Sequence, residues 1–242
     1  MDSNTEMVEM GRAKVDSNNF VRYLQGFSTT ESGQALEGRK EDFVSEIDLG
    51  EKITGIIDRM AETQKVKSVE QGKVVYVTIK TGEIGETNTV TGSELGVDLK
   101  PALMEAINNG GIPIMVVHSH PNEYMFTPKD YLTLVSGNEP KSIRITRAEV
   151  ILLPDNSQVM AVATSETPIF SSPEEAKKYL ANRDAELEEA IRTEAGSVGM
   201  DEVAARDAAA QKTNSMLVAM ASELNVKLYR RVEKGKFEAF SA

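Results

Sequence analysis

Both histidines of this 242-residue chain lie in one tripeptide, His118-Ser119-His120, at the end of an apolar run. The run, residues 112–117, predicts a short buried strand. Side chains two apart on a strand point to the same face, so His118 and His120 should project together, with Cα atoms about 7 Å apart. Two imidazoles arranged in this way can bind one metal ion. The sequence therefore predicts a metal site at the end of this strand.

A predicted helix start downstream offers a third ligand. Thr127 is suited to cap the helix, Pro128 to begin it, and Asp130 falls at its third position. Together with the two histidines, Asp130 would leave a fourth coordination position open, which is typical of a catalytic zinc site. The chain has no cysteine, so a thiolate zinc site and a disulfide framework are both excluded. The plainer alternative is that His118 and His120 are ordinary turn residues.

These residues resemble the JAMM motif of the JAB1/MPN family of metalloproteases. In that motif a distant glutamate precedes His-Xaa-His-Pro, and a serine or threonine follows three residues before an aspartate. The residues that match are His118, His120, Pro121, Thr127 and Asp130. The spacing from His120 to Asp130 is one residue shorter than in the eukaryotic deubiquitinases of the family, and Thr127 stands where serine is usual. The motif is in this respect similar to shorter JAMM-like domains of bacterial and bacteriophage proteins. The resemblance covers about residues 45–165.

The resemblance implies a catalytic glutamate at the first core strand. Glu70 stands at the head of that predicted strand and is our choice, with Glu83, Glu86 and Glu94, all in turn-rich sequence, as the alternatives. The implied activity is that of a Zn²⁺-dependent hydrolase, a metalloprotease or isopeptidase, in which Glu70 is the general base for a metal-activated water. Thr127 would donate to the developing oxyanion, unless it is only a helix cap.

The order of the predicted elements indicates an α/β fold. They are a helix at 48–63, a strand or hairpin at 67–79, a returning strand at 87–91, a short helix from 100, the strand from 112, a helix after Asp130, and strands at 142–146, 148–153 and 158–163. This order predicts an α+β sandwich with helices flanking a mixed sheet, in agreement with the JAB1/MPN resemblance. We predict a flexible polar arm over residues 1–40, the JAMM/MPN-like domain over 41–168, and a helical C-terminal appendage over 169–242 that ends in a β-hairpin.

Composition limits the expected partners and location. A net charge of −11 should keep the chain from nucleic acid and from anionic membranes. No apolar run is long enough for a membrane span and no signal peptide is visible, so we expect a cytoplasmic protein. The expected partner is a protein or peptide substrate, a ubiquitin-like conjugate being one such substrate. The C-terminal helices are candidates for contacts in a homo-oligomer.

Other classes of protein remain as alternatives. The His-Xaa-His pattern also opens the metal sites of amidohydrolases and PHP-type phosphoesterases, but these need further histidine ligands that the chain does not have. The chain can instead be a catalytically idle JAMM/MPN-like scaffold in a phage or mobile-element assembly. It can also be a peptidase-like module that processes its own partners in such an assembly, which differs in substrate rather than in chemistry.

Overall fold

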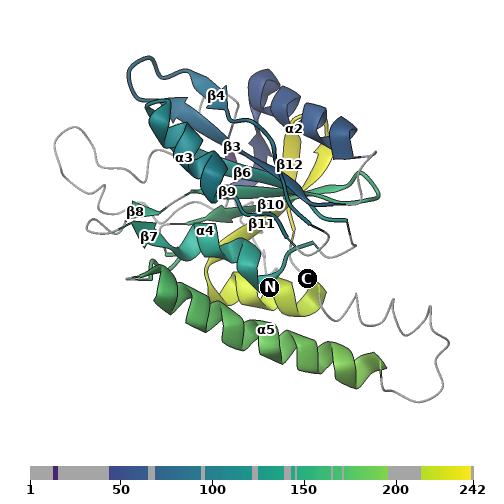
Figure 1. The fold of residues 1–242 in the computed structure, drawn as a ribbon. Coiled ribbons are helices and arrows are strands. Elements are labelled where there is room, and N and C mark those ends of the chain that lie inside the picture. The colour runs from purple at the N-terminus through teal and green to yellow at the C-terminus, as the bar shows by residue number, and fades with distance from the viewer. Residues whose placement is uncertain are drawn as a thin grey trace, which may run out of the picture.

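The computed structural model describes residues 13–15, 44–64, 69–93, 96–121, 125–138, 143–144, 146–164, 166–170, 172–195 and 214–240. Over these residues the chain forms one large sheet flanked by helices (Figure 1). The predicted α/β class is confirmed at this level.

The main sheet contains ten strands and is mixed. Its strands lie in the order β1 (Ala13–Val15), β2 (Val44–Asp48), β12 (Lys236–Ala239), β11 (Val226–Glu233), β10 (Gln158–Ala163), β9 (Ala148–Leu152), β6 (Gly111–Ser119), β3 (Gln71–Thr78) and β4 (Ile84–Glu86), and β5 (Val90–Thr91) also pairs with β3. Strands β6 and β9 are parallel, whereas the neighbouring pairs β3–β6 and β9–β10 are antiparallel. The strand predicted at 142–146 is reduced to β8 (Ile143–Arg144), which pairs with β7 (Gly137–Asn138) outside the main sheet.

The helices are α2 (Gly50–Gln64), α3 (Lys100–Asn108), the 3-10 helix η1 (Pro128–Tyr131), α4 (Leu132–Val135), α5 (Pro173–Ala195) and a further helix over residues 214–223. Helix α2 begins at Gly50, two residues after the predicted start, and the Asp48 carboxylate accepts a hydrogen bond from the backbone N–H of Gly50 at 2.8 Å. No helix in the described part of the chain has the length and apolar character needed to cross a bilayer.

The two faces of the sheet carry separate apolar cores. On one face an apolar stripe of α2 is buried against β3, β6, β9 and β10; its members are Ile53, Ile56, Ile57 and Met60. On the other face α3 packs over β3 and β6, while η1, α4, α5 and the helix at 214–223 pack over β9, β10 and β11. Burying each large apolar side chain in these cores, such as Ile53 of α2, contributes about 1.5–3 kcal/mol to the stability of the fold.

The predicted C-terminal hairpin is present as β11 and β12, but it is not an appendage. Strand β11 pairs with β10, and β12 pairs with β2, so both strands lie inside the main sheet (Figure 1). Tyr229 and Phe237 accordingly belong to the same core as α2. At the other end of the chain, residues 13–15 of the predicted N-terminal arm form β1, which pairs with β2. The rest of that arm lies outside the described residues.

Candidate metal centre

The two histidines lie at the end of β6, in the middle of the sheet. His118 pairs with Gly72 of β3 on one side and with Ile151 of β9 on the other. The backbone N–H of His120 donates to the carbonyl of Leu152 at 2.9 Å, so the pairing continues past the end of the strand. Both histidines are buried, and their Nε2 atoms are 3.0 Å apart. The alternation of side chains along one strand thus brings two imidazoles to one point.

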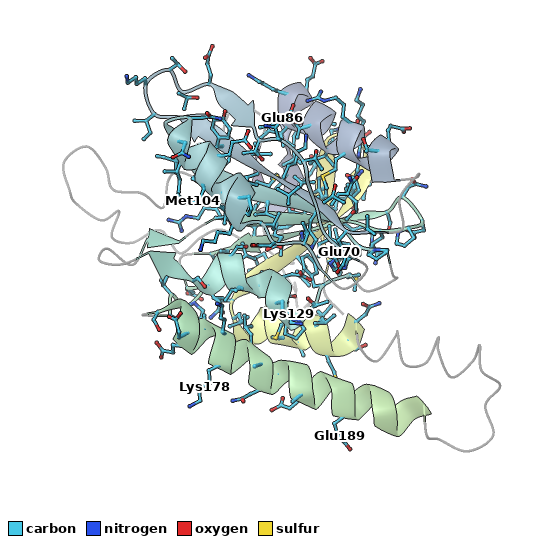
Figure 2. All side chains as sticks on the ribbon, viewed as in Figure 1. Glu70, Glu86, Met104, Lys129, Lys178 and Glu189 are labelled. Atoms are coloured by element: carbon cyan, nitrogen blue, oxygen red, sulfur yellow. The ribbon has the colours of Figure 1, made fainter. Side chains whose placement is uncertain are left out.

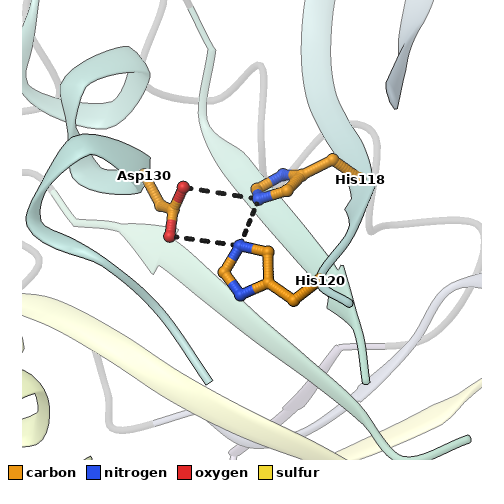
Figure 3. Close-up of side chains that lie close together, drawn as sticks. All are labelled: His118, His120 and Asp130. Carbon is orange, nitrogen blue, oxygen red and sulfur yellow. Dashed lines mark hydrogen bonds and ion pairs between the residues drawn. The ribbon is translucent and has the colours of Figure 1, made fainter. Parts of the chain in front are cut away.

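Asp130 reaches the same point from η1. Thr127 caps this helix and Pro128 begins it, as predicted, although the first turn is a 3-10 helix. The backbone N–H of Thr127 donates to the Asp130 carboxylate and so helps to fix its direction. Oδ1 of Asp130 lies 3.3 Å from Nε2 of His118, and Oδ2 lies 3.5 Å from Nε2 of His120 (Figure 3). His118, His120 and Asp130 form a group that could hold a metal ion.

The charge state of Asp130 suits this role. Burial by itself would raise the pKa of the Asp130 carboxyl. The charge of His120 and hydrogen bonds from both imidazoles outweigh the effect of burial, so this pKa lies well below its usual range. The carboxylate is therefore ionised at neutral pH. An anionic oxygen beside two imidazole nitrogens is a donor set that binds divalent transition metals.

Glu70 lies directly before β3. Continuing the β3–β6 register by two residues places Glu70 opposite His120, with its side chain on the same face of the sheet as both histidines. Burial raises the pKa of the Glu70 carboxyl, and the charges of His120 and His118 offset part of this rise. The backbone of Val97 also donates a hydrogen bond to the carboxyl group. Glu70 is therefore within electrostatic range of the three side chains that could hold a metal ion, and its catalytic role stays a prediction.

The alternative glutamates have other surroundings. Glu86 pairs with Val75, whose side chain packs with α2 on the opposite face of the sheet from the histidines. Its carboxylate binds Lys73 at 2.5 Å, and Figure 2 places it close to α2. Glu83 lies in an exposed turn, where its carboxylate accepts a hydrogen bond from a threonine hydroxyl at 3.1 Å. Glu94 lies outside the described residues. Of the three glutamates that the structure describes, Glu70 has the register that leads to the histidines.

Ser119 and Thr127 differ in what they do. The hydroxyl of Ser119 accepts a hydrogen bond from the backbone N–H of Gln71 at 3.0 Å, so it ties β6 to β3 and faces away from the imidazoles, as the strand period predicts. The backbone N–H of Thr127 donates to the Asp130 carboxylate in the N-terminal cap of η1. Its role as a donor to an oxyanion stays a prediction.

One residue beside the site was missed by the sequence analysis. Glu149, on β9, is 2% exposed, and its Oε1 lies 3.3 Å from Nδ1 of His118. Burial and the charge of Asp130 raise the pKa of the Glu149 carboxyl well above its usual range, while a hydrogen bond from Thr133 partly offsets this. The signal that could have revealed it is a carboxylate inside a run of five residues that are otherwise apolar and all buried.

Comparison with known proteins adds no assignment. No model of a known protein family matches the chain. No curated protein shows significant sequence similarity to it either. The case for a function therefore rests on the geometry of the site and on the residues that compose it.

Proposed function

We propose that this chain is a zinc-dependent hydrolase that cleaves a peptide or isopeptide bond. The observation that carries the proposal is the set of distances among the three ligand groups. A tetrahedral zinc site with bonds of about 2.0–2.1 Å has edges of about 3.3–3.4 Å between its ligand atoms. The Nε2 atoms of His118 and His120 are 3.0 Å apart, and the Asp130 oxygens lie 3.3 and 3.5 Å from them. Each imidazole nitrogen thus has an Asp130 oxygen at about the length of such an edge, and the three residues offer ligand atoms that all lie within 4.8 Å of one another.

The chemistry follows from the donor set. Two neutral imidazoles and one carboxylate leave a fourth position for water, as in catalytic rather than structural zinc sites. When bound, Zn²⁺ supplies a water of lowered pKa and an electrophile for a carbonyl oxygen. The chain itself has neither a cysteine nor a further histidine to act as a nucleophile or base. A carboxylate is then well suited to handle the proton.

Glu70 is the carboxylate suited to this step. Its raised pKa makes it a stronger base than an exposed glutamate, while the two imidazoles keep it ionisable. In the proposed reaction Glu70 accepts a proton from the attacking water and later delivers it to the leaving amine. Thr127 stands next to the helix that carries Asp130, and its hydroxyl is the proposed donor to the carbonyl oxygen.

The test is made in two stages. Elemental mass spectrometry of the purified protein should find about one zinc per chain, and His120→Ala should lose it. The matched control is Glu86→Gln, which changes a glutamate on the far face of the sheet and should keep the zinc. Zinc that binds equally to wild type and to His120→Ala would contradict the proposed ligand set.

The second stage addresses hydrolysis. The zinc-loaded protein is incubated with a fluorogenic peptide library and with isopeptide-linked substrates, beside Glu70→Gln. Cleavage by wild type that is lost in Glu70→Gln, with zinc retained, is the expected result. Stoichiometric zinc without cleavage of any peptide or isopeptide bond would favour an idle JAMM-like scaffold instead.

A further inference from the structure

Glu149 is a buried acid that the proposed reaction does not use. It lies on β9, where all five residues are buried and the other four are apolar. Moving a carboxyl group into such surroundings is unfavourable unless its oxygens find partners. Both oxygens of Glu149 have one. Oε1 lies 3.3 Å from Nδ1 of His118, and Oε2 accepts a hydrogen bond from the hydroxyl of Thr133 at 2.8 Å.

The topology of the sheet produces this contact. In the parallel β6–β9 pair, Val116 lies beside Glu149 and His118 lies beside Ile151. Side chains two apart share a face, so Glu149 and His118 point to the same side of neighbouring strands. Thr133, on α4, is three residues after Asp130. One carboxyl group therefore touches one metal-binding residue directly and the segment that carries another.

The contact with His118 involves the nitrogen that faces away from the metal-binding group. Nε2 of His118 is the atom close to His120 and Asp130 (Figure 3). Nδ1 is buried and has no well-aligned hydrogen bond, although Glu149 lies within 3.3 Å of it. A small rotation of the ring would convert this contact into an N–H···O bond. Glu149 cannot be a second general base, because it lies on the opposite side of the ring from the ligand atom.

We propose that Glu149 is a positioning residue for the metal centre. It accepts a hydrogen bond from Nδ1–H of His118, which leaves Nε2 of that ring unprotonated and directed at the metal. Through Thr133 it also joins β9 to the segment that carries Asp130. A carboxyl oxygen that accepts from a ligating histidine fixes the tautomer and the orientation of the ring. The inference rests on the proposed metal site, and it does not require that the site hydrolyses anything.

The experiment compares wild type with Glu149→Gln, Glu149→Met and Thr133→Val. Zinc affinity is measured by competition with a chromogenic chelator. A cooperative thermal unfolding transition of each metal-free protein serves to establish that the variant is folded. We expect Glu149→Met to bind zinc about 10–100-fold more weakly. Glu149→Gln, which keeps a neutral acceptor of the same shape, should lose less, and Thr133→Val should show a smaller loss in the same direction. Glu86→Gln is the matched control and should bind as wild type does.

A second readout separates positioning from general destabilisation. The chain has only two histidines, so the imidazole N–H region of a ¹H–¹⁵N spectrum of the zinc-loaded protein is simple to interpret. We expect a signal from Nδ1–H of His118 that is protected from exchange in wild type, weakened in Glu149→Gln and lost in Glu149→Met. If Glu149→Met does not fold, Glu149→Gln alone decides.

Two outcomes would overturn the inference. The first is zinc affinity in the folded Glu149 variants within about twofold of wild type. The second is an unchanged Nδ1–H signal in those variants. Either one leaves the proposed hydrolase standing, whereas a wild-type protein that binds zinc with the expected Glu149 dependence and cleaves nothing would overturn the hydrolase alone.

Discussion

Gly92 is the position where a single methyl group should separate metal binding from catalysis. Its backbone N–H donates to the carbonyl of Glu70 at 2.8 Å, and the N–H of Glu70 donates to the carbonyl of Ser93 at 2.9 Å. A Cβ atom at Gly92 would lie 2.2 Å from the carbonyl oxygen of Gly96 and 2.7 Å from Cα of Val97. Both are backbone atoms, so no side-chain rotation relieves the overlap. The segment that holds Glu70 must move.

The size of the effect follows from these distances. Non-bonded carbon atoms prefer separations of about 3.5–4.0 Å, so Gly92→Ala must displace the backbone near Val97 by about 1 Å. Overpacking of this kind lowers the free energy of unfolding by about 1–3 kcal/mol. Val97 also donates the hydrogen bond that reaches the Glu70 carboxyl. A misplacement of about 1 Å of a group that acts on the substrate lowers the rate about 100-fold.

Three measurements on Gly92→Ala test this reasoning. Urea unfolding should show the loss of about 1–3 kcal/mol, and hydrolysis should fall about 100-fold. Zinc stoichiometry and affinity should not change, because all three proposed ligands come from β6 and η1. The control is Gly55→Ala in α2, where the nearest atom to the added methyl group is the flexible end of Arg59 at 3.4 Å. That variant should be more stable by about 0.5–1 kcal/mol, since alanine favours a helix.

The reasoning is refuted if Gly92→Ala is destabilised as expected and still hydrolyses substrate at the wild-type rate. In that case the segment after β5 would not position Glu70. Loss of zinc from Gly92→Ala would refute a different point, namely that the metal ligands are held independently of this segment.

Three further predictions concern single side chains. Ser119→Ala removes the acceptor of the buried Gln71 N–H, and should lower the free energy of unfolding by about 1–3 kcal/mol in a denaturant titration while zinc content stays the same. Partial burial would raise the pKa of Glu86, but hydrogen bonds from Lys73 and Arg59 outweigh it and the pKa is lowered. The ionised Glu86 therefore stabilises the folded protein above the unfolded-state pKa. This contribution is lost as pH falls through the lowered folded-state pKa. Unfolding at pH 7 should thus show Glu86→Gln less stable by about 0.5–1 kcal/mol, since solvent screens this pair, and the difference should vanish in acid. A general base at Glu70 should give the kcat/KM profile an acid limb, with activity lost as pH falls and the carboxylate takes up a proton, and an acid limb that survives in Glu70→Gln would contradict the assignment.

The local parts of the site could be predicted from the sequence, because they depend on short-range periods. The strand period brings His118 and His120 to one face, and a Thr-Pro-Xaa-Asp helix start directs Asp130. Both patterns involve residues only a few positions apart, so they do not depend on how distant parts of the chain pack. Glu70 was chosen over Glu86 by its place at the head of the first core strand, whereas the strand register that separates the two side chains was not specified by the sequence.

The non-local parts could not be predicted for a related reason. An alternating strand such as β11 has the same pattern at the edge of a sheet and at its centre, and its partner is chosen by contacts far away in the chain. The predicted C-terminal appendage was wrong on this point. Glu149 was missed similarly, since its partner His118 lies on a neighbouring strand with a helical segment between them in sequence.

The position of β12 between β2 and β11 has a consequence for how the chain acquires its structure. Phe237 pairs with Ile47, so the two halves of the sheet join through residues separated by almost the whole described chain. Contacts of such long range slow folding, because a large loop must close before they form. During synthesis, the edges of β2 and β10 stay unpaired until residues 226–239 have been made. Unpaired strand edges recruit other chains, so the interval before the hairpin inserts is the period in which this protein is most prone to aggregate.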